Sequence, residues 1–334
     1  MEKISVIICH HKGRLIDKAI DSILASRNVE VEVIIATSDE SWLKENQPRK
    51  RVTGFYCEGG PAHKRNVAFR FAQYPLIAFF DDDIETTLYA LDEMAKSLDD
   101  KSLGMVFGKL LNMEFRDRFD EAGSFLTSSG FLWARAESGI QDNGQYDSVV
   151  PILSGKSASC MVRRSVFVEV GMFDASYEIL GEETDLAWRV WLSGYKVLFV
   201  PSSTTFHAFN TKFKPADFYV PRRVYFNGCR NYISMLLTNL ETKNLLFPIF
   251  IQISVWIMAG IGMFLTGKKE ASFNIFYGLG YVFRNLRSIL KKRHKVQSSR
   301  KISDKELFKM VLRNPPISYY TKRFCHYIKT GRHG

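Results

Sequence analysis

Residues 1–110 alternate short, nearly continuous apolar runs with segments in which apolar residues recur at helical spacing. Such runs are typical of strands buried on both faces of a parallel sheet, and their alternation with helices is the pattern of βαβ units. We predict strands at residues 4–8, 31–36, 52–56, 76–80 and 104–108, with helices at residues 15–25 and 61–72. The pattern therefore predicts an α/β fold.

The pattern breaks after residue 110. Residues 112–149 are punctuated by Gly, Ser and Asp, and we expect irregular or β-rich covering structure there. Periodicity returns with predicted strands at residues 158–162 and 196–200. A short helix is predicted from Arg164, and a longer one from residue 181 that ends at Gly194, which is suited to a left-handed cap.

A long apolar stretch lies near the carboxyl end of the chain. Residues 244–267 are free of charged side chains and long enough to span a bilayer, and residues 271–290 form a more amphipathic stretch of interfacial character. A single span would place the basic residues that follow on the far side of the membrane, against the tendency of Lys and Arg to stay cytoplasmic. We therefore expect a re-entrant or in-plane segment; a single span and a buried core helix are the alternatives.

The net charge of +11 is a property of this end of the chain. From Arg284 onward there are 15 Lys and Arg against 2 acidic residues, whereas residues 1–283 carry 31 basic against 33 acidic ones. A basic tail beside an apolar segment favours an anionic membrane surface over nucleic acid as partner. The five cysteines lack CxxC spacing, and no signal peptide is recognisable, so we expect a reducing, cytosolic setting.

Three consecutive carboxylates, Asp81 to Asp83, follow the apolar run at residues 76–80. Ligands of parallel sheets bind beyond the carboxyl ends of the strands, and three like charges raise one another's pKa unless a cation neutralises them. A divalent metal site is one interpretation. An acidic turn that caps a helix at residues 86–98 is the other.

Clusters of charged residues lie in the first turns of two predicted helices. Lys64 and Arg65 lie in the first turns of the helix that opens with Gly59-Gly60-Pro61, where cations oppose the helix dipole. An anionic diphosphate nearby would explain them; solvated surface side chains are the alternative. Three carboxylates, Glu182, Glu183 and Asp185, gather in the first turn of the helix at residues 181–192, more than capping requires.

Several short motifs follow one another in the chain: Arg65-Asn66, Asp81-Asp82-Asp83, Ser154-Gly155, Phe173-Asp174, residues 181–189, Gly194-Tyr195, His207 and Arg230-Asn231. In this order and spacing they resemble the inverting glycosyltransferases of family 2, most closely their rhamnosyltransferase-like, membrane-associated members. The resemblance implies the GT-A fold, a Rossmann-like mixed sheet flanked by helices that binds a nucleotide-diphospho-sugar, with a helical, membrane-associated region after it.

The resemblance also implies roles for the acidic cluster. Asp83, together with Asp81, would hold Mg²⁺ or Mn²⁺ against the donor diphosphate. Asp81 or Asp82 would lie near the ribose. His207 would be a further metal ligand, with an ordinary loop histidine as the alternative. The other expected donor-binding residues are His10, Lys12, Thr37, Asp39, Lys64, Arg65, Asn66, Gly155 and Arg230.

Two positions depart from the family pattern. The family usually reads Glu-Asp where this chain reads Glu182-Glu183, so Glu183 takes the place of the catalytic base, and Asp185 becomes a supporting or helix-packing acid. The family often carries Asp after the second strand, where this chain has Thr37. Thr37 or Asp39 would then contact the nucleobase, and His10 would stack on or hydrogen-bond to the nucleotide or remain a simple loop residue.

We therefore expect a GT-A catalytic domain over residues 1–215, with a nucleotide-sugar half at about 1–110 and an acceptor half at about 111–215. A helical extension at 216–243, a membrane-associated segment at 244–290 and a basic tail at 291–334 would follow. The expected activity is metal-dependent, inverting transfer of a sugar from a nucleotide-sugar to a glycan or lipid-linked acceptor. It would take place on the cytoplasmic membrane face, with the protein peripheral or monotopic. The alternatives are a sugar-phosphate nucleotidyltransferase and a catalytically inactive, membrane-tethered binding protein.

Overall fold

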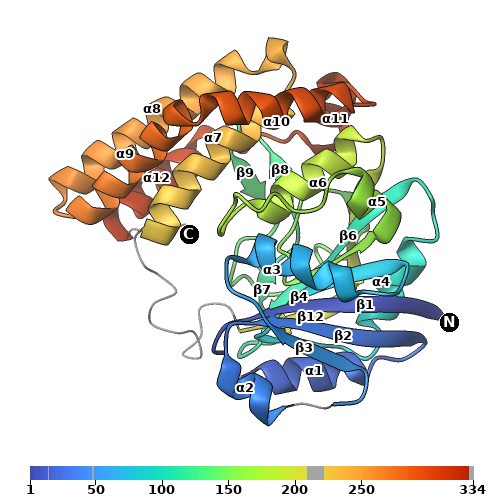
Figure 1. The fold of residues 1–334 in the computed structure, drawn as a ribbon. Coiled ribbons are helices and arrows are strands. Elements are labelled where there is room, and N and C mark those ends of the chain that lie inside the picture. Colours follow the sequence, from blue (N-terminus) through green and yellow to red (C-terminus); the bar gives the residue numbers. More distant parts are fainter. Residues whose placement is uncertain (14, 47–48, 209–221, 331–334) are drawn as a thin grey trace. The chain divides into compact units, whose positions relative to one another are not determined.

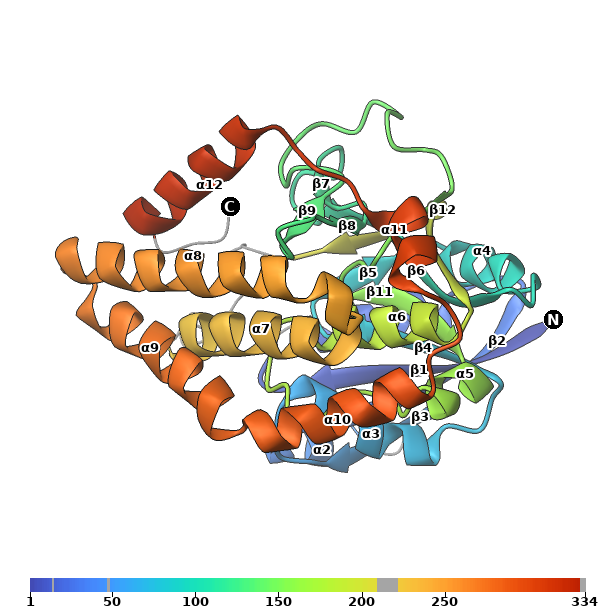
Figure 2. The ribbon, with the colours of Figure 1, turned by 90° about the horizontal axis from the view of Figure 1, so that it is seen from above.

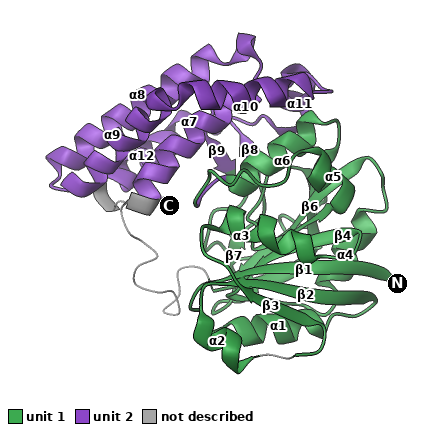
Figure 3. Ribbon diagram, in the orientation of Figure 1, with its two compact units in different colours: residues 1–124, 134–178, 182–218 green, residues 125–133, 179–181, 219–334 purple. Residues whose placement is uncertain are grey.

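The computed structural model describes residues 1–13, 15–46, 49–208 and 222–330. The chain forms two compact units (Figure 3). The first comprises residues 1–124, 134–178 and 182–218, and the second comprises residues 125–133, 179–181 and 219–334. The domain boundary expected at residue 215 lies outside the described residues and stays a prediction.

The first unit is an α/β structure (Figure 1). Its strands are β1 (Glu2–His10), β2 (Val29–Thr37), β3 (Val52–Tyr56), β4 (Leu76–Asp81), β5 (Ile84–Thr86), β6 (Leu103–Asn112), β7 (Phe119–Glu121), β10 (Val150–Pro151), β11 (Ser159–Arg163) and β12 (Lys196–His207). Its helices are α1 (Ile16–Leu24), α2 (Glu40–Glu45), α3 (Pro61–Ala68), α4 (Ala90–Ser97), α5 (Arg164–Glu169) and α6 (Glu182–Leu192). Every strand predicted for residues 1–110 is present.

The sheet has the order β10-β12-β6-β11-β4-β1-β2-β3. Strand β1 pairs in parallel with β2 on one side and with β4 on the other. The chain therefore adds β2 and β3 on one side of β1 and then crosses over to add β4 on the other side. The carboxyl ends of β1 and β4 flank the point where the strand order reverses. Crevices at such switch points are where open α/β sheets bind ligands.

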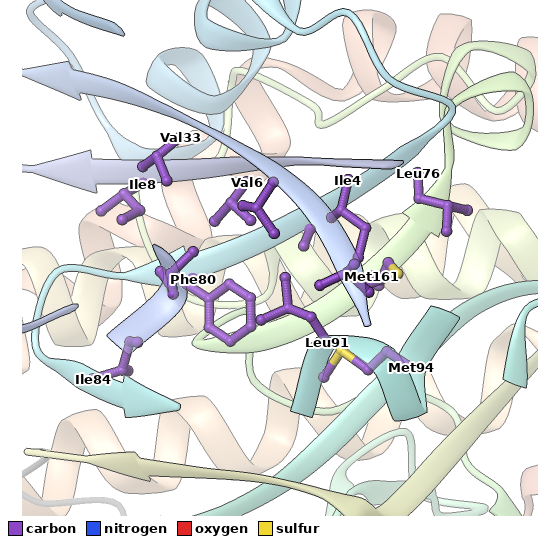
Figure 4. Packing of buried hydrophobic residues seen from close by; sticks show 14 of the residues in the cluster. Ile4, Val6, Ile8, Val33, Leu76, Phe80, Ile84, Leu91, Met94 and Met161 are labelled. Atoms are coloured by element: carbon purple, nitrogen blue, oxygen red, sulfur yellow. The ribbon is translucent and has the colours of Figure 1, made fainter. Parts of the chain in front are cut away.

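Both faces of the central strands are buried. Alternate residues of β1, Ile4, Val6 and Ile8, lie on one face with Phe80 and with side chains of α1 and α4 (Figure 4). On the other face an aromatic cluster forms, in which the ring centroid of Phe79 lies 5.3 Å from that of Phe167 and 5.0 Å from that of Phe173. This two-sided burial explains why the strands are apolar throughout instead of alternating.

Three predicted elements differ in extent. The helix expected at residues 86–98 begins only at Ala90, because residues 84–86 form β5 and pair with β12. The helix expected at residues 61–72 ends at Ala68 and continues as a 3-10 turn, Phe69–Phe71. The strand expected at residues 196–200 continues to His207, past a register shift.

The expectation of irregular or β-rich covering structure at residues 112–149 is confirmed. The segment contains β7, which pairs with the edge of β6, and a two-stranded sheet of β8 (Ser124–Leu126) and β9 (Leu132–Ala134). Irregular connections link them.

The second unit is largely helical. Its helices are α7 (Asn227–Asn239), α8 (Leu246–Leu265), α9 (Lys269–Arg284), α10 (Leu286–Ser298), α11 (Asp304–Val311) and α12 (Ile317–Thr330). Helices α7 to α10 and α12 share an apolar core that includes Cys229, Trp256, Met263 and Ile275. The amphipathic stretch at residues 271–290 is divided at Asn285 between α9 and α10. Within the described residues, α8 is the one helix long and apolar enough to cross a membrane.

Candidate active site

Three predicted site segments meet at the carboxyl edge of the sheet because their strands are neighbours in register. Cys9 of β1 pairs with Asp81 of β4, and His10 pairs with Thr37 of β2. The loop after β1, the end of β2 and the acidic turn after β4 therefore lie at one edge. The switch-point topology makes this edge the candidate ligand site.

The acidic turn contributes to a group that fits a metal ion. Oδ1 of Asp83 lies 3.1 Å from Nε2 of His207, and Oδ2 of Asp81 lies 3.9 Å from the same nitrogen. One ligand atom of each of the three residues lies within 4.8 Å of the others. Two carboxylates and an imidazole are a donor set that divalent ions such as Mn²⁺ accept.

Tertiary pairing brings His207 to this turn from far along the chain. Strand β5 runs antiparallel to β12 with Ile84 opposite His207, and the backbone N–H of Ala208 donates to the carbonyl of Asp83 at 2.9 Å. The helix-capping interpretation of the carboxylates is wrong. Strand β5 follows them directly, and α4 begins only at Ala90 and has no side-chain cap.

A second acid fixes the orientation of His207. Nδ1 of His207 lies 2.8 Å from Oδ2 of buried Asp120, and since a carboxylate only accepts, Nδ1 is the donor and Nε2 is directed to Asp83. Lys156 donates to the other oxygen of Asp120 at 2.7 Å. Burial alone would lower the pKa of His207, but the Asp83 and Asp120 carboxylates outweigh it and raise the pKa to about 10. A metal ion would take the place of that proton.

Neither Asp120 nor Lys156 stood out in the sequence. Asp120 lies in a segment without clear periodicity, and its side chain is almost fully buried beneath the histidine. The short alternation Phe119-Asp120-Glu121 is a weak strand signal, and nothing in it indicates which residue the acid contacts. Only the pairing of β7 with β6 places it there.

Asp82 has a different environment from its neighbours. Burial, and then the charges of Asp83 and Asp81, raise its pKa to about 7. The contribution of the two neighbouring charges has the direction expected for clustered carboxylates. A Cβ atom added at Gly13 would lie 2.7 Å from Oδ2 of Asp82, so the loop after β1 needs glycine for its close approach to this acid.

Arg65 connects the acidic turn with α6. Its side chain is buried, with Nη2 lying 3.0 Å from Oδ1 of Asp81 and Nη1 lying 3.2 Å from Oε1 of Glu182. Lys64 is buried as well and donates to the carbonyl of His10 at 2.8 Å and to Oγ of Ser38 at 3.0 Å. The interpretation of Lys64 and Arg65 as solvated surface residues is therefore wrong.

The three acids that open α6 have three different surroundings. Glu182 is paired with Arg65, and Asp185 is paired with Arg189 one turn further along, 2.7 Å away. Burial, followed by the negative charge of Glu182, raises the pKa of half-buried Glu183 well above its ordinary value. A carboxyl group whose pKa is raised by burial and by a neighbouring charge is a candidate general base.

The remaining residues predicted to bind the sugar donor differ in burial and in their contacts. The His10 ring lies 2.9 Å from the Thr37 hydroxyl through Nδ1, and burial lowers its pKa. Oδ1 of Asp39 caps α2 by accepting from two backbone N–H groups, and Lys12 is exposed in the loop after β1.

Two further candidates have structural contacts in the first unit, and one lies in the second. Both polar atoms of the Asn66 amide bond to the backbone of Phe173, at 2.8 and 3.1 Å. Gly155 packs against the ring of Phe107, which leaves no room for a Cβ atom. Arg230 belongs to the second unit, where its guanidinium lies 5.1 Å from the Tyr281 ring centroid.

Two family models match the chain. One, described as glycosyl transferase family 2, matches residues 5–170, and the other, glycosyl transferase family group 2, matches residues 112–284. The second covers more than half of the chain. Together they include the acidic turn, α6 and His207.

Curated relatives resemble the chain over part of its length. A probable N-acetylgalactosaminyltransferase 8 of Caenorhabditis elegans is 28% identical over 155 residues, which are 43% of this chain and 36% of the relative. The O-antigen biosynthesis protein RfbC of Myxococcus xanthus is 26% identical over 224 residues, which are 61% of this chain and 17% of the relative. The chain thus spans about a third or less of these relatives.

Solved structures resemble the chain more completely. GalNAc-T7 with UDP, GalNAc and Mn²⁺ superimposes with a TM-score of 0.57 at 14% identity, over 86% of this chain and 58% of that one. S. aureus TarS residues 1–349 in complex with UDP-GlcNAc gives a TM-score of 0.57 at 16% identity, over 90% and 88% of the two chains. At these identities the likeness establishes the fold, which is the GT-A fold.

Proposed function

This chain belongs to glycosyltransferase family 2, and we propose that it transfers a sugar with inversion from a nucleotide-sugar to a hydroxyl of a glycan or lipid-linked glycan. The observation that supports this best is the contrast between the surroundings of two adjacent glutamates. Glu182 is neutralised by Arg65, whereas Glu183 keeps a high proton affinity at the start of α6.

The donor half of the proposal uses the acidic turn. Asp81, Asp83 and His207 would hold Mg²⁺ or Mn²⁺, which supplies positive charge to the donor diphosphate. Asp120 keeps Nε2 of His207 directed toward the two carboxylates. Lys64 and Arg65 lie buried at the same edge of the sheet, where Arg65 contacts Asp81 and Glu182.

The acceptor half of the proposal uses Glu183. An acceptor hydroxyl forms a bond to the anomeric carbon while the bond from that carbon to the diphosphate oxygen breaks, and the nucleoside diphosphate leaves. The hydroxyl proton passes to the Glu183 carboxylate. A single displacement of this kind inverts the anomeric configuration. The high proton affinity of Glu183 favours the transfer of the proton.

Two observations bear on the acceptor and the location. The RfbC relative is named for O-antigen biosynthesis, and α8 is long and apolar enough to cross a membrane. We infer an acceptor of the cell-surface glycan class, presented on a lipid, and transfer on the cytoplasmic face of the membrane. Membership in a glycosyltransferase family argues against the nucleotidyltransferase and the inactive tether.

A donor screen tests the proposal. The full chain would be mixed with Mn²⁺ and single nucleotide-sugars, and thermal stabilisation would identify the donor because a ligand of the folded state raises apparent stability. Release of nucleoside diphosphate with a soluble acceptor, and the anomeric configuration of the product by NMR, would then be measured. We expect Asp83→Ala to abolish turnover and Asp99→Ala, an exposed acid outside the site, to keep it. Retention of configuration, or full activity of Asp83→Ala, would refute the proposal.

A further inference from the structure

We propose that the second unit docks on the lipid bilayer with α8 and α9 parallel to the membrane plane, so that their exposed apolar side chains enter the headgroup–acyl boundary. The inference rests on the proposed membrane location and specifies the surface and the orientation. Neither follows from the apolar composition of residues 244–267, which fits a span equally well.

Helix α8 has two faces of different accessibility. One face is buried in the unit, where Gln252, Trp256, Ala259 and Met263 lie at helical spacing. The opposite face is largely apolar and is exposed in two stretches, residues 246–250 and 257–265, which are separated by a half-buried segment that contains Ser254. Its exposed residues are Leu246, Phe247, Phe250, Ile257, Met258, Ile261, Phe264 and Leu265, of which Phe250 is 68% and Leu265 78% exposed.

Helix α9 extends this exposed face, and the two helices lie side by side (Figure 2). The ring centroids of Phe264 and Phe273, both exposed, are 6.4 Å apart. The Phe276 ring lies over Gly260, where a Cβ atom would come within 2.8 Å of it, so glycine permits the close approach of the helices. We name the exposed apolar residues of α8 together with Phe273, Phe276, Tyr277 and Phe283 of α9 the apolar stripe.

The helices before and after α8 pack against each other. Arg293 of α10 donates to the carbonyls of Leu237 and Leu240 at the end of α7, each at 2.6 Å. Gly278 of α9 lies against the carbonyl of Phe226 at the start of α7. Both ends of α8 therefore belong on the same side of a membrane, and a single span would break these contacts.

A re-entrant hairpin is disfavoured by charge. Lys268, which precedes α9, and Lys269 and Glu270, which open it, lie at the tip of the α8–α9 hairpin, and an inserted hairpin would carry them into the hydrocarbon core. Charged side chains at that depth cost several kcal/mol. Helices that lie in the interface leave the same residues at the level of the headgroups.

Basic side chains border the continuation of the stripe. On α9 and α10 the exposed Arg284, Arg287, Lys291 and Lys295 follow one another at helical spacing beside exposed Phe283, Leu286 and Leu290. This pairing of apolar and cationic surface is complementary to anionic lipid. A second copy of the chain would bring the same cations together, which makes a bilayer the better partner for this surface.

Vesicle flotation of the full chain tests the docking surface. The probes are phosphatidylcholine vesicles with and without phosphatidylglycerol. We expect Phe250→Glu combined with Ile261→Glu to lower the partition coefficient at least about tenfold, because two apolar contacts with lipid are lost. The matched control is Phe115→Glu, which changes a 55% exposed phenylalanine of the first unit and should leave binding unchanged. Equal binding of all three proteins would overturn the proposal.

Depth measurements test the orientation without relying on the stability of the double variant. Nitroxide labels at Phe250→Cys, Ile257→Cys and Phe264→Cys would be introduced in a Cys325→Ser background, since Cys325 is an exposed cysteine. Similar depths at the three positions support the in-plane orientation. A maximum at position 257 with both ends at the surface indicates a span, and labels that stay in water indicate no insertion; either result overturns the proposal.

Two further measurements separate this inference from the proposed function and from self-association. Mn²⁺-dependent donor hydrolysis in detergent reports on the active site, so a chain that hydrolyses donor but does not bind vesicles overturns the docking inference alone. Sedimentation of the lipid-free protein with and without Phe250→Glu reports on dimers. A dimer that this substitution dissociates would assign the stripe to a second copy and overturn the lipid proposal.

Discussion

Glu182 and Glu183 are neighbours in sequence with opposite electrostatic surroundings. Glu182 forms an ion pair with Arg65, whereas burial and the charge of Glu182 raise the pKa of Glu183. A base must accept a proton during the reaction, so a raised pKa adds to its strength but narrows the pH range in which it is ionised. These surroundings are consistent with the prediction that Glu183 is the base, which stays a prediction.

The pH dependence of transfer tests this assignment. Because protonated Glu183 cannot accept a proton, we expect the rate to fall as the pH is lowered through the raised pKa, and to recover at higher pH. Glu183→Gln should lower turnover by about 10²–10⁴-fold and remove this limb of the profile, with donor affinity unchanged. Steady-state rates across the pH range measure it. The control is Glu45→Gln, an exposed glutamate at the end of α2; an unaltered profile in Glu183→Gln would place the base elsewhere.

Asp120 is predicted to act on the metal through His207. Asp120→Asn replaces a charged acceptor of the Nδ1 proton with a weaker one, and removal of such a partner typically lowers metal affinity by about 10–100-fold. Titration of the protein with Mn²⁺, followed by calorimetry or by the EPR signal of free Mn²⁺, measures this without any turnover. Asp117→Asn, an exposed acid of the same segment, should bind Mn²⁺ as the parent does. Equal affinities would show that His207 keeps its orientation without Asp120.

At the scale of elements, the site depends on how closely α3 approaches the segment before α6. A Cβ atom at Gly60, the residue before the first turn of α3, would lie 2.5 Å from the backbone carbonyl oxygen of Glu178. The backbone on at least one side must move to accept it. Since Lys64 and Arg65 are positioned by this helix, such a movement displaces both.

Gly60→Ala is therefore expected to lower the free energy of unfolding by roughly 1–3 kcal/mol, the usual cost of overpacking. Chemical denaturation monitored by circular dichroism gives the value. Gly280→Ala is the matched control, because its Cβ would meet only the far end of Arg284 at 3.4 Å and alanine favours the helical conformation of α9. A loss of stability in Gly280→Ala equal to that in Gly60→Ala would contradict the explanation.

At the scale of the whole molecule, the charge is distributed unevenly. Residues from Arg284 onward hold the excess of Lys and Arg, while residues 1–283 are slightly acidic. Apolar contact with lipid is insensitive to salt, whereas attraction to anionic headgroups is screened within about 10 Å at 0.1 M ionic strength. The two components of the proposed docking can thus be separated.

We expect added salt to weaken binding to phosphatidylglycerol-containing vesicles and to leave binding to pure phosphatidylcholine nearly unchanged. Arg287→Glu with Lys291→Glu should reproduce the effect of salt at low ionic strength, since each Lys or Arg near an anionic surface contributes about 1 kcal/mol. Flotation across a salt series measures it. Arg70→Glu, an exposed arginine of the first unit, serves as the control. Binding that salt does not alter on either vesicle would contradict a role for the basic residues.

Much of the fold was predictable because short-range signals dominate it. The central strands β1, β4 and β6 are largely apolar because both of their faces are buried, and α3 begins at Pro61 as its Gly-Gly-Pro opening indicates. The helix and strand boundaries that were predicted wrongly depend on pairing with strands distant in sequence. Strand β5 shortens the following helix because it pairs with β12, and β12 is long because β5 and β6 both lie beside it.

The sequence by itself determined the acidic turn, the acids of α6, the apolar length of α8 and the family order of these motifs, because each is a contiguous pattern. Only the tertiary structure decided which of them meet. It placed His207 beside the acidic turn, in contact with Asp120, which the sequence did not indicate. It also paired Arg65 with Glu182 and not with Glu183. It also buried one face of α8 and left the other exposed. Contacts between strands and helices far apart in the chain set these pairings, and no local pattern of residues encodes them.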